Sequence, residues 1–124
     1  MSKDVISSSP HLRDNVTTAR IMQDVCIQNL PVIFMIDRAG AVGNDGATHQ
    51  GLFDISYLRM LPNMKIFSPK DTVESKMIFD YCKKLSCPCA IRYPNGSNCD
   101  FEKHLPLESS LWEYYGDTEK NIVL

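Results

Sequence analysis

Residues 37–51 contain the side chains of this sequence best suited to bind phosphate and transfer protons. Arg38, Asp45 and His49 stand there among four glycines. A guanidinium carries a fixed charge and several N–H donors suited to phosphate or carboxylate. Imidazole titrates near neutral pH and can exchange a proton with a substrate oxygen, while Asp45 can orient a hydroxyl or the imidazole. We therefore expect this segment to bind a small phosphorylated, hydroxylated metabolite.

Each of these residues also has an ordinary structural explanation. A histidine in a loop often belongs to a turn, an aspartate before glycine is common turn chemistry, and an arginine after a strand often pairs with a nearby acid. The glycine spacing is neither a Walker motif nor a dinucleotide fingerprint, because no helix with the required glycines follows it. The residue types alone do not decide between these explanations.

Composition narrows the possible partners. With 13 Lys and Arg against 15 Asp and Glu, the net charge of -2 gives no reason to expect nucleic acid or an anionic membrane. Residues 1–10 lack the apolar core of a signal peptide, and no later segment has the length and hydropathy of a membrane span. We expect a cytoplasmic protein.

The cysteines do not indicate a disulfide framework or a metal site. There are five of them, an odd number in a chain without an export signal. Four fall within residues 82–99 with His104 nearby, but no C-x-x-C pair is present. We expect reduced thiols and no metal ligands.

The elements around residues 37–51 alternate between helix and strand. An almost wholly apolar run at residues 31–36 is typical of a strand covered on both faces of a parallel sheet. Helical spacing of apolar residues precedes and follows this run. The predicted elements are a helix from Asp14 or Asn15 to about Asn29, a strand at 31–36, a helix at 53–61, a strand at 63–67, a helix after Ser68, and a strand at 89–93.

This order predicts an α/β fold with three layers, α/β/α, around a mostly parallel sheet. Ligands of such sheets bind beyond the carboxyl ends of the strands. The segments that leave those ends are residues 37–51, 68–71 and 92–96, so Arg92 also lies on the predicted binding rim.

Two of the predicted helices carry detailed assignments. Ser68 is expected to cap the later helix, with Pro69 at its first position. Its expected buried stripe comprises Val73, Met77, Ile78, Tyr81 and Leu85. In the preceding helix Phe53, Tyr57 and Leu58 are expected to pack on a buried face.

The combined spacing is more specific than its parts. Residues 37–59 read Asp37-Arg38-Ala-Gly-x-Val-Gly-x-Asp45-Gly46-x-Thr48-His49-Gln50-Gly51-x-Phe53-Asp54-x-Ser56-Tyr57-Leu58-Arg59. This pattern resembles the pyrimidine-binding domain of the 1-deoxy-D-xylulose 5-phosphate synthase family, within the transketolase superfamily. Asp24 to Pro31, Ser68-Pro69-x-Asp71 and Arg92-Tyr93-Pro94 resemble it too, so the match covers residues 23–96. Related transketolases share Asp-Gly-x-Thr-His, but Arg38 and Gly51-x-Phe53-Asp54 favour the deoxyxylulose phosphate branch.

The resemblance implies a thiamine-diphosphate-dependent transferase with a thiamine-diphosphate-binding fold. Enzymes of that family condense pyruvate with glyceraldehyde 3-phosphate, release carbon dioxide, and feed isoprenoid, thiamine and pyridoxal biosynthesis. The resemblance implies catalytic roles for His49 and Asp45, and substrate contacts from Arg38, Asp45, His49 and Arg92. Arg38 would contact the acceptor phosphate, Asp45 its hydroxyl, and His49 the reacting oxygens.

The sequence also departs from the family. Asn95 replaces an arginine that follows Tyr-Pro and helps to hold phosphate. The glutamate that activates the aminopyrimidine and the Gly-Asp-Gly motif for Mg²⁺ and diphosphate are not found in the sequence. Because thiamine diphosphate needs both walls of its site, we expect no intrinsic turnover.

These departures predict a fragment or a subunit. The expected divisions are a divergent amino-terminal segment at 1–14, a partial pyrimidine-binding domain at 15–96, a linker at 97–119, and the start of a truncated strand at 120–124. A homodimer or a complementary subunit would complete the site. The alternatives are a noncatalytic partner-binding remnant and a part of another superfamily enzyme, such as a transketolase half or the β subunit of a 2-oxoacid dehydrogenase.

Overall fold

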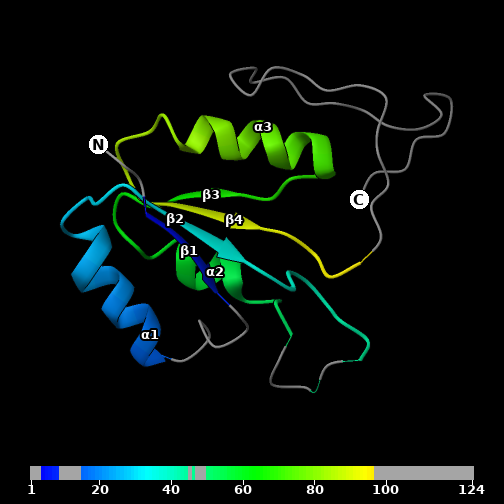
Figure 1. Ribbon diagram of the computed structural model, residues 1–124. Helices are drawn as coiled ribbons and strands as arrows, with labels where there is room; N and C mark the ends of the chain where they lie inside the picture. The colour runs from blue at the N-terminus through cyan, green and yellow to red at the C-terminus, as the bar shows by residue number, and fades with distance from the viewer. Residues whose placement is uncertain (1–3, 9–14, 45, 47–49, 97–124) are drawn as a thin grey trace, which may run out of the picture.

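The sheet of this protein is wholly parallel and has four strands. The computed structural model describes residues 4–8, 15–44, 46 and 50–96. The strands are β1 (Asp4–Ser8), β2 (Val32–Ile36), β3 (Lys65–Phe67) and β4 (Cys89–Arg92), in the spatial order β1-β2-β4-β3. Figure 1 shows them side by side. The predicted α/β class is confirmed.

Helices cover both faces of the sheet. The helical elements are α1 (Asn15–Arg20), which continues as the π-helix η2 (Ile21–Cys26), then α2 (Asp54–Leu58) and α3 (Thr72–Cys82). In Figure 1, α1 and α2 lie on one face and α3 on the other. The chain advances across the sheet from β1 to β2 and on to β3, then turns back to β4. Since crossovers are right-handed, the reversal carries α3 to the opposite face.

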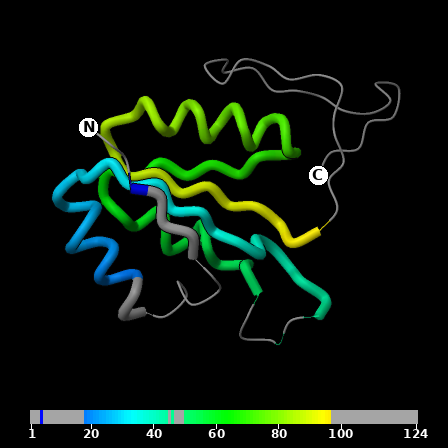
Figure 2. The backbone as a smooth tube through the Cα atoms, viewed as in Figure 1, coloured from blue at the N-terminus to red at the C-terminus, as the bar shows by residue number. Residues whose placement is uncertain are grey.

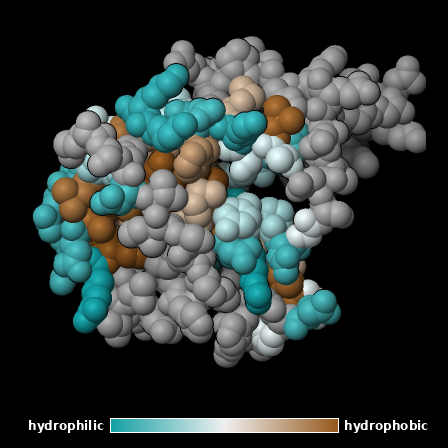
Figure 3. Space-filling model, in the orientation of Figure 1, coloured by the Kyte–Doolittle hydropathy of each residue, from teal (hydrophilic) through white to brown (hydrophobic). Residues whose placement is uncertain are grey.

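The core divides between the two faces by the alternation of the strands. On β2, Phe34 and Ile36 pack in one cluster with Ile21 of η2 and Leu58 of α2. The intervening Ile33 packs in a second cluster with Ile78 and Cys82 of α3, and Cys89 and Ile91 of β4 join it. Both faces of β2 are thus covered, which explains why its sequence is apolar throughout. The outer surface of α3 is hydrophilic, as Figure 3 shows.

Strand β1 was not predicted from the sequence. It pairs with β2 in parallel, from Asp4 opposite Val32 to Ser8 opposite Ile36. Its five residues are Asp-Val-Ile-Ser-Ser, and three of them are polar, so the run does not have the apolar pattern typical of a strand. Its assignment as a strand depends on the hydrogen bonds that β2 provides, which residues 4–8 alone do not reveal.

Helix α3 begins later than predicted. Its cap is Asp71, whose side chain accepts a hydrogen bond from the Glu74 N–H (2.8 Å). Glu74 in turn accepts one from the Lys70 N–H (2.7 Å), which resembles a capping box. The assignment of Ser68 as cap and Pro69 as first helical residue was therefore wrong.

Two assignments of buried side chains were also wrong. Val73 is 45% exposed, because it lies five positions before the buried Ile78 and therefore about 140° away around the helix. Cys82, four residues after Ile78, is buried instead. Phe53 is 71% exposed because it precedes α2 as its N-cap residue, whereas Leu58 is buried as expected.

No helix among the described residues is long and apolar enough to cross a membrane.

Candidate functional site

The loop at residues 37–51 leaves the sheet where β2 and β4 end together. Beyond the regular strands, the Tyr93 N–H donates to the Ile36 carbonyl (3.0 Å) and the Ala39 N–H donates to the Tyr93 carbonyl (3.0 Å). The first residues of the loop therefore prolong the pairing of β2 with β4. Figure 2 shows the chain running on from β2 past the end of the sheet. The predicted position at the carboxyl ends of the strands is confirmed for the described part of the loop.

Arg38 occupies a strained position at the start of this loop. Its φ of 60° is in the left-handed region, which non-glycine residues rarely adopt. The Asp37 carboxylate accepts a hydrogen bond from the Arg38 N–H (2.7 Å) and lies 3.7 Å from its Nε. The two side chains are 35% and 36% exposed. Arg38 thus keeps a partly hydrated guanidinium at the end of a rigid strand.

Gly40 and Gly51 close the loop, and we call this pair the loop base. The Gly40 N–H donates to the Gly51 carbonyl (3.1 Å), and the Gly51 N–H donates to the Gly40 carbonyl (2.8 Å). A Cβ atom on Gly51 would lie 2.4 Å from the Arg38 carbonyl oxygen. The close approach of the two chain segments therefore requires glycine at position 51.

Gln50 adds a second set of contacts that sequence reasoning did not single out. Its Oε1 accepts from the Val42 N–H (2.6 Å), and its Nε2 donates to the Val42 carbonyl (3.0 Å) and the Gly46 carbonyl (3.3 Å). A primary amide can serve both groups of one residue in this way because it carries a donor and an acceptor. The feature of the sequence that could have indicated a role for Gln50 is its place between His49 and Gly51.

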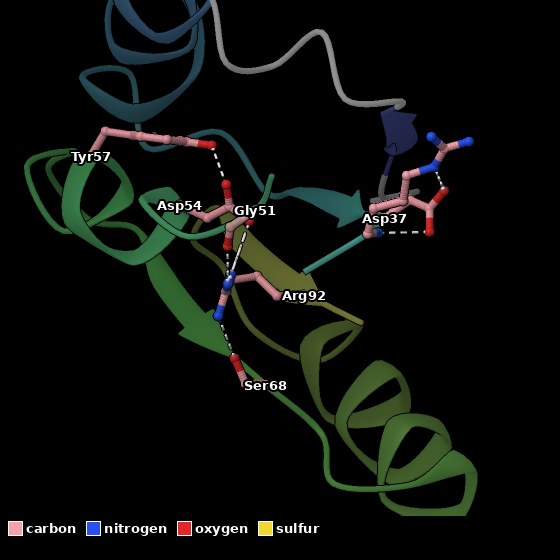
Figure 4. A network of polar contacts seen from close by, with 7 residues as sticks. Asp37, Gly51, Asp54, Tyr57, Ser68 and Arg92 are labelled. Atoms are coloured by element: carbon pink, nitrogen blue, oxygen red, sulfur yellow. Dashed lines mark hydrogen bonds and ion pairs between the residues drawn. The ribbon is translucent and has the colours of Figure 1, made fainter. Parts of the chain in front are cut away.

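Arg92 is buried at the end of β4 and contacts three chain segments (Figure 4). Its Nε and Nη2 each lie 3.4 Å from Oδ2 of Asp54, which is only 1% exposed. Nη2 also donates to the Gly51 carbonyl (3.0 Å). Nη1 donates to Oγ of Ser68 (3.2 Å), and the Tyr57 hydroxyl donates to Oδ1 of Asp54 (2.7 Å).

The structure separates the predicted site residues into two groups and leaves two of them undescribed. Arg38 pairs with Asp37, which lies apart from the Arg92 contacts in Figure 4. Arg92 points into the protein, a position that favours a role in holding backbone over direct contact with substrate. Asp45 and His49 lie outside the described residues, so their roles stay predictions. Asn95 is exposed just after β4.

Among the residues that the structure describes, no group of three or more His, Cys, Asp or Glu side chains is placed to hold a metal ion. In this part of the chain no disulfide joins Cys26, Cys82, Cys87 or Cys89 to another of the four.

The sequence of residues 11–99 matches the model of the transketolase pyrimidine-binding domain. The chain belongs to this family. This membership agrees with the α/β fold and the parallel sheet of the structure.

Curated relatives and solved structures agree with this assignment. The chain is 55% identical over 78 residues to the 1-deoxy-D-xylulose-5-phosphate synthase of Aliarcobacter butzleri, an alignment that covers 63% of this chain and 13% of the relative. It is 48% identical over 101 residues to the synthase of the same name from Clostridium acetobutylicum, covering 79% of this chain and 16% of the relative. The chain therefore spans about a sixth or less of the length of these relatives.

Among solved structures, the fold is similar to a split-gene transketolase described as an inactive beta4 tetramer. The TM-score is 0.64 at 27% identity, with 74% of this chain and 29% of that chain covered. The transketolase of Campylobacter jejuni matches with a TM-score of 0.61 at 23% identity, over 73% of this chain and 14% of that one, and supports the fold alone.

Family membership implies thiamine diphosphate in the complete enzyme. The described residues do not offer the available carboxylate or the metal ligands that the cofactor needs. The two buried carboxylates among them are engaged, Asp54 by Arg92 and Tyr57, and Asp71 by the start of α3.

Proposed function

We propose that this chain supplies part of the pyrimidine-binding wall of a 1-deoxy-D-xylulose 5-phosphate synthase. That enzyme condenses pyruvate with glyceraldehyde 3-phosphate and releases carbon dioxide, using thiamine diphosphate and Mg²⁺. A complementary chain, or a second copy within a larger assembly, would supply the diphosphate- and metal-binding wall. The chain alone is not expected to turn over substrate.

The placement of Arg38 carries this proposal. The residue stands at the carboxyl end of β2, where parallel sheets bind ligands, and its guanidinium is partly exposed. Its contact with Asp37 is 3.7 Å long and partly hydrated, so the ion pair is weak. A phosphate can compete for such a guanidinium and accept two parallel hydrogen bonds from it.

The remaining roles rest on the resemblance and on chain order. Asp45 would bind the acceptor hydroxyl, and His49 would hold or transfer a proton at the reacting oxygens. Both residues belong to the loop that Gly40, Gly51 and Gln50 close at its base.

The test is a reconstituted assay. The full 124-residue chain is co-expressed with a chain that carries the remaining segments of a deoxyxylulose phosphate synthase, and carbon dioxide release from pyruvate is measured with and without glyceraldehyde 3-phosphate. Arg38→Ala should raise the KM for glyceraldehyde 3-phosphate by about tenfold or more, because a charge-assisted contact is lost. His49→Ala should lower kcat by about a hundredfold.

Arg20→Ala is the matched control, since Arg20 is an exposed arginine at the end of α1. It should leave both constants unchanged. If Arg38→Ala behaves like Arg20→Ala, Arg38 does not bind the acceptor and the site assignment is wrong.

A noncatalytic, partner-binding role is the second candidate, and Asn95 favours it. In the family that this sequence resembles, an arginine at this position helps to hold the acceptor phosphate, and the amide of Asn95 carries no charge. Thermal-shift titration with glyceraldehyde 3-phosphate separates the two proposals, since a ligand of the folded state raises Tm. A Tm increase that is lost in Arg38→Ala supports the enzymatic role, and no increase in the assembled complex supports the noncatalytic one.

A further inference from the structure

Arg92 and Asp54 form a buried ion pair whose presence the fold alone does not require. Their side chains are 9% and 1% exposed. Burying two charges carries a large desolvation cost before their attraction is counted, and well-packed apolar residues often serve stability equally well. A buried pair at the edge of a ligand-binding sheet therefore calls for an explanation beyond stability.

The guanidinium connects elements that are far apart in the sequence. Through Asp54 it contacts the first turn of α2, and through Ser68 the segment after β3. Its contact with the Gly51 carbonyl reaches the loop base. The planar group of arginine can direct several N–H donors at fixed angles, and an ammonium group cannot do the same.

Two of the three partners of Arg92, the Gly51 carbonyl and Asp54, are themselves held in place. The Gly51 carbonyl accepts a second hydrogen bond from the Gly40 N–H, so both of its lone pairs are used. Asp54 uses Oδ2 for Arg92 and Oδ1 for the Tyr57 hydroxyl. The order of contacts runs from Tyr57 through Asp54 and Arg92 to Gly51 (Figure 4). The backbone hydrogen bond between Gly51 and Gly40 continues it to the other half of the loop base.

We propose that Arg92 is a positioning residue that fixes the base of the 37–51 loop through the Gly51 carbonyl, with Asp54 orienting its guanidinium. Arg92 then acts on the reaction through the loop, without contacting the substrate. The effect of Arg92 on catalysis rests on the proposed function of the loop. Its effect on the hydrogen bonds of the loop base does not depend on that proposed function.

The first measurement is amide hydrogen exchange in the full 124-residue chain, which needs neither substrate nor partner. Arg92→Lys keeps the charge and removes the planar group. Exchange of the Gly40 and Gly51 amides should accelerate about tenfold relative to wild type, because a charge-assisted bond to the loop base is lost. Exchange of the Ile91 amide in the sheet should change much less.

Two further variants keep the test decisive. Ser68→Ala removes the contact to Nη1 and leaves the Gly51 contact in place, so the loop base should exchange as in wild type. Tyr57→Phe removes only the hydroxyl that orients Asp54, and it serves if Arg92→Lys does not fold. It should accelerate Gly51 exchange severalfold.

The proposal is overturned if the loop base of the folded variants exchanges as in wild type, or if Ser68→Ala accelerates exchange as much as Arg92→Lys. The second measurement uses the reconstituted enzyme, where Arg92→Lys should raise the KM for glyceraldehyde 3-phosphate and leave that for pyruvate unchanged. Faster loop exchange with unaltered kinetics would support the positioning of the loop and count against the proposed function of the loop.

Discussion

Arg38 combines an unfavourable backbone conformation with a partly exposed guanidinium. Its φ of 60° costs about 1 kcal/mol or more for a residue with a Cβ atom. Strain of this kind tends to collect at binding sites, where the position of a side chain matters more than stability. Arg38 fits this pattern because its guanidinium stands at the carboxyl end of β2.

Because of this strain, we expect that replacing Arg38 with glycine makes the fold more stable and weakens acceptor binding. Arg38→Gly should raise the free energy of unfolding by about 1 kcal/mol, since glycine adopts a positive φ without a steric penalty. The same change should weaken acceptor binding in the reconstituted enzyme. Arg38→Ala is the matched control, because it loses the guanidinium and keeps the strain. Urea denaturation measures the free energy of unfolding of the two variants. Equal stabilities of Arg38→Gly and Arg38→Ala would argue against strain at this position.

Cys26 is a second residue whose environment has a measurable consequence. Its side chain is fully buried where η2 ends, and burial raises the pKa of its thiol above the ordinary value of 9.0. The unfolded chain therefore loses this proton at lower pH than the folded chain does. The contribution of Cys26 to stability is complete below about pH 9 and declines as pH rises from there toward the raised pKa.

We expect the free energy of unfolding to fall more steeply above pH 9 in wild type than in Cys26→Ala. Urea denaturation of the two proteins across this pH range measures the difference, and Cys26→Ala removes the titrating group itself. Stability curves that stay parallel through pH 10 would show that Cys26 does not contribute to the alkaline loss.

At the scale of elements, the 37–51 loop depends on the close contact at its base. A methyl group on Gly51 would meet backbone atoms of Arg38, Ala39 and Gly40, the nearest at 2.4 Å. Backbone cannot move aside as a flexible side chain can, so Gly51→Ala must separate the two segments. Separation would also draw the Gly51 carbonyl away from Arg92.

Gly51→Ala should therefore lower the free energy of unfolding by about 1–3 kcal/mol, the usual cost of overpacking. Gly43→Ala is the matched control within the same loop, because nothing lies within 4 Å of a Cβ placed there. Chemical denaturation of both variants checks the prediction. If Gly43→Ala lowered the free energy of unfolding by the same amount, the effect would not be specific to the loop base.

At the scale of the whole molecule, large apolar side chains are exposed around α2. They are Leu52 at 58%, Phe53 at 71%, Ile55 at 44% and Met60 at 69%. Exposed apolar side chains of this size favour association or aggregation in a protein studied alone. The chain also spans only 13–16% of the length of the two synthases compared above, so its surroundings in a complete enzyme would differ greatly.

We predict that the double variant Phe53→Ser and Met60→Ser increases the soluble fraction of the chain expressed alone by about twofold or more. Val73→Ser is the control, because Val73 is similarly apolar and 45% exposed but lies on α3, across the sheet. Soluble yield and light scattering measure the outcome. An equal gain from Val73→Ser would point to general surface hydropathy as the cause, with no special role for the region around α2.

The sequence alone was enough to predict which strand is buried on both faces, and at which end of the sheet the candidate site lies. The apolar run of β2 indicated a strand buried on both faces, and the glycine-rich segment after it indicated a loop at the carboxyl edge. These features depend on composition and local periodicity, which each segment carries by itself. Arg38 could be placed at this edge for the same reason.

Tertiary structure decided the features that depend on a partner distant in the chain. Residues 4–8 are a strand because β2 provides hydrogen bonds along one side. Asp54 turns inward because Arg92, 38 positions later, meets it there, so an arginine expected to bind substrate is engaged inside the protein. Gly51 is required because the Arg38 carbonyl lies against it. Residue spacing specifies which face a side chain occupies, whereas the group it meets there is fixed only when distant segments fold together.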